Sequence, residues 1–249
     1  GPDELAFYAK DAYDIQFLDK DGTHKYVWQT SWGTSTRLIG GLIMAHGDQR
    51  GLVLPPKVAP VQVVVVPVAA HKPGVTEACE AIEAELKAAG IRVVLDTRDQ
   101  SPGWKFNEWE MKGVPVRFEV GPRDIENGIV TYCTRHDNAK GTMAREGIGQ
   151  AAVELLDAIQ HAMYAKSLAF RDSHVRICHN MDEIAQALDA KCFAKIVWDQ
   201  DPAGEALVKE KLQATVRVML EDETPFRQEC SINGAKCEHP VVTLVARAY

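Results

Sequence analysis

The middle of the chain alternates short apolar runs with segments of helical periodicity. Residues 61–68 form a β-branched run, which is typical of a strand covered on both faces. Apolar residues then recur at helical spacing from Val75 to Ala89, and Gly90 marks the end of that helix. Further strands are predicted at 91–95, 114–120 and 128–133, and a long helix at about 143–168. This alternation predicts a mixed sheet with helices on its faces.

A second, smaller α/β pattern follows from about residue 169 to residue 249. Asn180 and Glu183 have the spacing of a capping box, which predicts a short helix through Leu188. A strand is predicted at 193–198 and a helix at 204–213. Two more strands are predicted at 215–220 and 241–246, so this part of the chain reads as a small α/β domain.

The first 58 residues carry too much apolar content for so short a segment to form a domain of its own. A strand pair is predicted at 13–18 and 26–30, joined by a turn that contains Asp21-Gly22. An apolar helix is predicted to begin at Arg37 and to continue through Met44. Prolines at 55, 56 and 60 then stop regular structure and indicate a linker.

Composition and charge narrow the function classes. The chain has 249 residues and a net charge of −7, which argues against nucleic-acid binding through bulk charge. Residues 98–145 are nearly neutral, however, so a local site stays open. No apolar run reaches the roughly 18 residues that a membrane span needs. Six scattered cysteines suit free thiols in a reducing cytoplasm better than a disulfide framework.

Residues 30–37 combine a strand end, a glycine turn and an arginine at a helix start. The guanidinium of Arg37 suits phosphate oxygens because its planar fork makes bidentate, charge-assisted bonds. Gly33 lets the backbone approach a base or ribose closely. The alternative is a surface arginine at a helix start. For Ser35 and Thr36, a plain N-capping role is nearly as good an interpretation as nucleotide contact, and the two roles can coexist.

Residues 101–117 alternate aromatic, basic and acidic side chains next to a predicted strand. Such a surface can stack unpaired bases, and its charges match the edge of guanine: carboxylates accept from N1–H and N2–H, and Lys or Arg reaches O6 and N7. The candidates for RNA contact are Lys105, Glu108, Lys112 and Arg117. The alternative is that the aromatic residues belong to the core, and Trp109 favours that interpretation.

Cys237 and His239 are the weak candidates for a metal site. Thiolate and imidazole can hold zinc, but a structural site needs four ligands, usually as two close pairs. The second pair is not evident, so the sequence argues against a bound zinc. Cys178 and Cys192 are interpreted as packing residues.

The motif around Arg37 and the stretch after Ser101 together carry a family resemblance. Residues 30–60 resemble the third signature motif of class II aminoacyl-tRNA synthetases in its prolyl form, over more than twenty consecutive positions. Residues 101–124 resemble the anticodon-binding domain of class IIa synthetases, again in the prolyl form. The resemblance implies three parts: a piece of the antiparallel catalytic sheet at 1–58, an α/β anticodon-binding domain at 59–168 and the C-terminal domain at 169–249.

The same resemblance implies a proline–tRNA ligase that uses ATP and Mg²⁺ to activate proline and then charges tRNA(Pro). Arg37 would contact the ATP phosphates, Trp32 and Gly33 would line the adenine and proline pockets, and Ser35 and Thr36 would lie at the nucleotide. Two guanines of the anticodon would be read by the second stretch. The full enzyme would be a cytoplasmic homodimer without a membrane or DNA partner.

Two other functions stay open. The family's first and second motifs are not found in these 249 residues, so we expect the isolated chain not to form prolyl-adenylate. The chain could then be a tRNA-binding module or paralogue without chemistry of its own. A scaffolding role is least favoured, because it gives the motif that ends in Arg37 no purpose.

Overall fold

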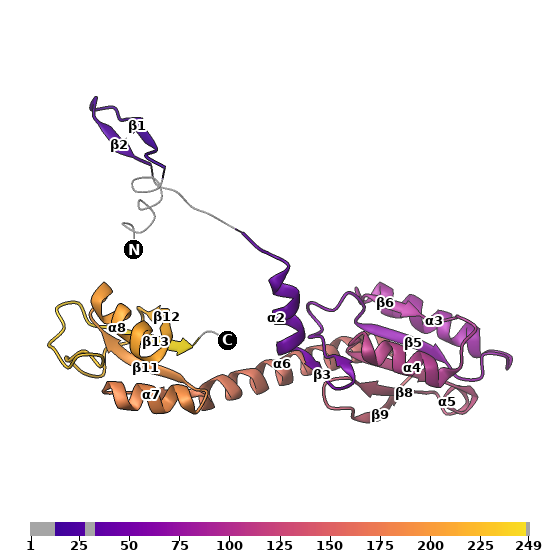
Figure 1. Ribbon diagram of the computed structural model, residues 1–249. Helices are drawn as coiled ribbons and strands as arrows, with labels where there is room; N and C mark the ends of the chain where they lie inside the picture. The colour runs from indigo at the N-terminus through magenta and orange to yellow at the C-terminus, as the bar shows by residue number, and fades with distance from the viewer. Residues whose placement is uncertain (1–12, 28–32, 248–249) are drawn as a thin grey trace.

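The computed structural model describes residues 13–27 and 33–247. Its larger sheet has five strands in the order β6-β5-β7-β8-β9 (Figure 1). Strand β5 runs parallel to both β6 and β7, whereas β7, β8 and β9 are successively antiparallel. The strands are β5 (Val63–Pro67), β6 (Val93–Leu95), β7 (Val116–Val120), β8 (Ile129–Thr134) and β9 (Lys140–Ala144).

Both faces of β5 are covered, as its β-branched sequence predicted. Val63 and Val65 pack in the core beneath helices α3 (Val75–Ala88) and α6 (Ile148–Ser173). Val64 and Val66 face the other way, where they pack near Phe106 and Trp109 of α4 (Pro102–Met111). Helix α4 therefore lies across the opposite face of the sheet from α3 and α6. The short helix α5 (Pro122–Glu126) joins β7 to β8.

A second sheet of four strands forms the C-terminal unit, and α6 leads from the first sheet to the second (Figure 1). Its order is β10-β11-β13-β12, with β10 and β11 parallel and the other pairs antiparallel. The strands are β10 (Val175–Ile177), β11 (Phe193–Trp198), β12 (Ala214–Leu220) and β13 (Val241–Arg247). Helices α7 (Met181–Asp189) and α8 (Pro202–Leu212) contribute Ile184, Leu188 and Val208 to its core.

The N-terminal part contains a small hairpin, a helix and a two-residue strand pair. The elements are β1 (Gln16–Leu18), β2 (His24–Tyr26), α2 (Arg37–Ala45), β3 (Gly47–Asp48) and β4 (Gly51–Leu52). Helix α2 buries none of its residues, although Leu38, Ile39, Ile43 and Met44 are large and apolar.

The structure confirms the mixed α/β class. It also confirms the helix that starts at Arg37 and the helix capped by Asn180, whose Oδ1 accepts from the Glu183 N–H at 2.9 Å. None of the helices in the described ranges has the length and hydrophobicity that a membrane span requires.

The structure differs from the predicted elements at several points. Residues 140–144 form β9 instead of leading into a helix, which begins only at Ile148 and continues to Ser173. Strand β10 was not predicted, because three residues of half-buried or exposed character give no clear period. The second hairpin strand begins at His24, and the predicted continuation through residues 28–30 lies outside the described part of the chain.

Candidate functional site

Helix α4 places the polar and aromatic residues that follow Ser101. Ser101 is the N-cap, and its Oγ accepts a hydrogen bond from the Trp104 N–H at 3.3 Å. Pro102 occupies the first turn, where the missing N–H costs nothing. The stretch interpreted as a possible base-stacking surface is therefore a helix. One side of it packs on β5, and the rest faces solvent.

Asp96, just after β6, fixes this helix to the sheet. Its carboxylate is almost fully buried and accepts from Arg98 at 2.9 and 2.7 Å and from the Trp109 indole at 2.8 Å. The Lys105 ammonium donates to the Asp96 backbone oxygen at 3.0 Å. The Arg98 guanidinium, helped by the Trp109 indole, holds the pKa of the Asp96 carboxyl well below its ordinary value, although burial opposes this shift.

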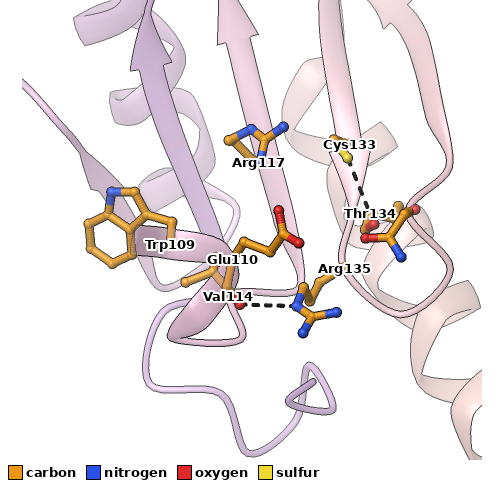
Figure 2. Close-up of a pocket in the computed structure, with 8 residues that line it drawn as sticks. Trp109, Glu110, Val114, Arg117, Cys133, Thr134 and Arg135 are labelled. Atoms are coloured by element: carbon orange, nitrogen blue, oxygen red, sulfur yellow. Dashed lines mark hydrogen bonds between the residues drawn. The ribbon is translucent and has the colours of Figure 1, made fainter. Parts of the chain in front are cut away.

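A small pocket opens beside the end of α4, where β7 begins and β8 ends. In Figure 2 the Glu110 carboxylate points into the space between the guanidinium groups of Arg117 and Arg135. The cavity measures about 20 Å³, room for roughly one water molecule, so a base would have to sit at its mouth or displace a side chain. Its lining residues are Trp109, Glu110, Val114, Arg117, Cys133, Thr134, Arg135 and Asn138.

The charged residues of the pocket are held by partners around them. The Arg117 guanidinium lies 4.1 Å from the Phe106 ring centroid and donates to Glu119 at 3.0 and 2.7 Å. Glu110 accepts from Arg50 at 3.1 Å. Because each group has a packed or paired neighbour, the wall presents a carboxylate and guanidinium groups in defined positions.

A second group of side chains lies on the solvent side of α4. The Arg98 guanidinium lies over the ring of Trp104, 5.1 Å from its centroid, and Trp104 is 46% exposed. Glu108 accepts from Arg98 at 2.6 Å and from Lys112 at 2.7 Å. These two cations lower the pKa of the Glu108 carboxyl, Arg98 more than Lys112.

The predicted RNA-contacting residues thus have different environments. Arg117 lines the pocket, and Glu108 and Lys112 are paired on the solvent side of α4. Lys105 is only 4% exposed, and its ammonium points to Asp96; this residue is corrected to a core position. Trp109 packs against the core and also lines the pocket, so its predicted core role is confirmed.

Sequence reasoning missed four polar residues of the pocket, Glu110, Thr134, Arg135 and Asn138. Glu110 lies within residues 101–117 but was not among the predicted candidates. Arg135 and Asn138 come from the turn between β8 and β9. The polar run at 135–138 between two strands is the one local signal that could have indicated them.

The candidate nucleotide-binding residues lie at the start of α2. The Arg37 N–H donates to Ser35 Oγ at 3.4 Å, and Thr36 occupies the N-cap position without a side-chain cap bond. Ser35, Thr36 and Arg37 are all exposed, as is Gly33, and Trp32 lies outside the described residues. The structure therefore places these residues together but leaves the phosphate role of Arg37 a prediction.

The weak metal candidates do not form a cluster. Within the described ranges, no group of three or more His, Cys, Asp or Glu side chains is arranged to hold a metal ion. Cys237 is buried, and the His239 backbone N–H donates to Asp199 at 2.6 Å. Cys178 and Cys192 are buried, in agreement with their predicted packing role.

Comparisons with known proteins match two regions of the chain to family models. A family model described as the anticodon binding domain matches residues 62–155, and one described as prolyl-tRNA synthetase, C-terminal, matches residues 181–249. A proline–tRNA ligase 2 of Clostridioides difficile is 47% identical over 240 residues, which cover 96% of this chain and 50% of that protein. The chloroplastic/mitochondrial proline–tRNA ligase of Arabidopsis thaliana is 40% identical, with 96% of this chain and 45% of that protein covered.

The fold comparison points the same way. The crystal structure of prolyl-tRNA synthetase from Cryptosporidium parvum, complexed with L-proline and AMP, matches with a TM-score of 0.82 and 33% identity. The match covers 98% of this chain and 53% of that one. The chain thus spans about half the length of the curated relatives that it matches. Two domain models, the relatives and the shared fold together show that the chain belongs to the prolyl-tRNA synthetase family and forms a C-terminal region of it, with the anticodon-binding domain included.

Proposed function

We propose that this chain provides anticodon recognition for an enzyme that uses ATP to activate proline and transfers it to tRNA(Pro). The observation that carries this proposal is the pocket beside α4, where the Glu110 carboxylate lies between two arginines. We further propose that the chain divides at about residues 58 and 168 into a part of the catalytic domain, the anticodon-binding domain and the C-terminal domain.

The chemistry of the pocket suits guanine better than the other bases. Guanine presents two N–H donors on its Watson–Crick edge, which a carboxylate accepts, and oxygen and nitrogen acceptors at O6 and N7, which guanidinium groups reach. An unpaired base can stack on an aromatic side chain, and Trp104 exposes such a ring on the same helix. Since the chain is acidic overall, specificity must come from these placed groups rather than from bulk attraction.

The residues at the start of α2 are proposed to serve the adenylation step. Arg37 would contact the phosphates of ATP, whose negative charge Mg²⁺ would partly neutralise. The nucleotide and proline sites would be lined by Trp32, Gly33, Ser35 and Thr36. Acyl-adenylate formation needs positioning and charge stabilisation rather than a side-chain nucleophile. A homodimeric, cytoplasmic enzyme is part of the same proposal.

Binding of a short RNA to the 249-residue chain tests the recognition role. The probes are a proline anticodon stem-loop and the same stem-loop with its two guanines replaced by adenines. We expect the chain to prefer the first. We expect Glu110→Gln and Arg117→Gln each to lower that preference by roughly 5- to 100-fold, since one good bidentate base contact discriminates by about 1–3 kcal/mol.

The control is Arg171→Gln, which removes an exposed arginine from the end of α6, where it pairs with neighbouring Asp172. This variant should leave the preference unchanged. If the Glu110 and Arg117 variants weaken both RNAs equally, these residues meet only phosphate or serve the core, and guanine recognition at this pocket is excluded.

A further inference from the structure

The segment that follows α2 is locked against the rim of the pocket. A Cβ atom on Gly51 would lie 2.4 Å from the backbone oxygen of Met111, so only glycine allows this approach. The Leu54 N–H donates to the Gly113 oxygen at 3.2 Å. The short pair of β3 and β4 is therefore fixed to the end of α4, although about sixty residues separate them along the chain.

Asp48, in β3, reaches the pocket from this segment. Its two carboxylate oxygens accept from the Arg135 guanidinium at 2.6 and 2.9 Å, and Arg135 Nε donates to the Glu110 backbone oxygen at 3.0 Å. The Arg135 side chain is 3% exposed, whereas that of Asp48 is 43% exposed. Arg135 lowers the pKa of the Asp48 carboxyl, so Asp48 is ionised at neutral pH.

These bonds fix the plane of the Arg135 guanidinium and leave part of it available. Arginine has five N–H donors. Three donate to the Asp48 carboxylate and the Glu110 backbone oxygen, and the remaining two have no hydrogen-bond partner among the residues that the structure describes. Since Arg135 lines the pocket, a ligand there meets a guanidinium whose direction is set by Asp48 and whose charge Asp48 balances.

We propose that Asp48 is a positioning residue for RNA recognition: it holds Arg135 so that the remaining donors read a base in the pocket. This inference rests on the proposed function and deepens it. It also assigns part of the RNA site to the segment that carries α2, three residues after that helix ends. Arg50 supports the same rim through its bonds to Glu110 and to Asn138 at 3.3 Å.

The direction in which RNA affinity changes when the Asp48 charge is removed distinguishes a positioning role from a purely structural one. Removing the Asp48 charge frees a cation beside the RNA, so binding of any stem-loop should hold or rise, and the salt dependence should steepen. Discrimination should fall, because a guanidinium without its bidentate partner can meet phosphate or solvent as readily as a base edge. A purely structural role would instead lower the melting temperature and weaken both RNAs together.

The experiment compares Asp48→Asn and Asp48→Glu in the 249-residue chain, with the two stem-loops described above as probes. We expect Asp48→Asn to reduce the affinity ratio between them at least fivefold and Asp48→Glu to restore much of it. Glu85→Gln is the matched control, because Glu85 makes a similar 2.6 Å ion pair with Arg145, away from the pocket. It should leave the ratio unchanged.

Arg135→Lys provides a second test that keeps the charge but loses the fork. Arg135→Lys should reduce the affinity ratio between the two stem-loops as Asp48→Asn does. The double variant Asp48→Asn/Arg135→Lys should reduce this ratio little more than either single variant, because both substitutions act through the same contact. Circular dichroism and melting curves check folding. An unchanged ratio in folded Asp48→Asn and Arg135→Lys overturns the inference while the proposed function stands. A wild-type chain that does not discriminate overturns both.

Discussion

The indole nitrogen of Trp109 donates a hydrogen bond of 2.8 Å to the buried carboxylate of Asp96. This contact joins α4 to the segment that follows β6. Trp109 is also part of the pocket wall, so the position of the wall depends on a buried charge behind it. Arg98 completes the arrangement with two further bonds to the same carboxylate.

Acid should therefore weaken this domain through Asp96. Its pKa is lowered in the folded chain, so the unfolded chain takes up the proton first as the pH falls below about 4. The contribution of Asp96 to the free energy of unfolding is fully present above that pH and is lost as the pH falls toward the folded pKa. We expect Asp96→Asn to cost about 1–3 kcal/mol at pH 7 and to flatten the acid dependence.

Urea unfolding between pH 3 and pH 7 measures this effect. Asp99→Asn is the control, because Asp99 lies three residues later and is exposed. It should change the free energy of unfolding by less than about 0.5 kcal/mol. An Asp96→Asn variant with wild-type stability at pH 7 would show that the buried carboxylate contributes nothing.

Cysteine reactivity should report the occupancy of the pocket. Cys133 lines the pocket and is partly exposed, whereas Cys79 is fully buried and burial raises the pKa of its thiol to about 12. Because the thiolate is the reactive form, iodoacetamide at pH 8 should label Cys133 well before Cys79. The proline anticodon stem-loop should slow labelling of Cys133. Peptide mass spectrometry after timed alkylation measures both rates, and an equal rate with and without RNA would place the RNA elsewhere.

A side chain at Gly113 should destabilise the fold for two separable reasons. Its φ of +74° is strained for other residues, and an added Cβ would lie 2.6 Å from Leu52. Gly90 has a φ of +79° and nothing within 4 Å of such a Cβ. We expect Gly90→Ala to lower the free energy of unfolding by about 1–2 kcal/mol from strain alone, and Gly113→Ala by clearly more. Equal losses in denaturant titrations would mean that the contact with Leu52 relaxes freely.

The 249-residue chain should show no proline-dependent exchange of pyrophosphate into ATP. Arg37 lies on a helix that buries none of its residues, and stabilisation of developing charge needs a site from which water is excluded. Radiolabelled pyrophosphate exchange is the measurement. In the same preparation, Arg37→Ala should leave binding of the anticodon stem-loop unchanged. Exchange above background that requires proline would contradict the expectation.

Much of the fold followed from local patterns. Strand β5 was predicted from its continuous β-branched run. The structure explains why this run lacks polar alternation, because every residue of β5 is buried. Helix α7 was placed correctly because Asn180 satisfies the backbone of its own first turn. Strand β9 was missed, because its alternation rests only on Gly141 and Met143, and its pairing with β8 decides its state.

The candidate site was only partly predictable. Lys105 and Lys112 are seven residues apart on or next to one helix, so periodicity gives them the same face. Yet Lys105 is buried against Asp96, while Lys112 is exposed beyond the last residue of α4. Lys105 is buried because the tertiary structure places Asp96 beside it. The spacing of polar residues along the helix does not indicate the position of Asp96.

By itself, the sequence determined the elements whose state depends on neighbours within about four residues, and the family motifs carried by Arg37 and by the stretch after Ser101. The tertiary structure alone decided that Asp48 meets Arg135 across 87 positions and that Glu110 rather than Lys105 lines the pocket. The reason is physical: a capped turn or a buried strand is selected by local bonds and burial. A charged pair between segments that are distant in sequence, such as Asp48 and Arg135, forms only where packing brings the two segments to within hydrogen-bond distance.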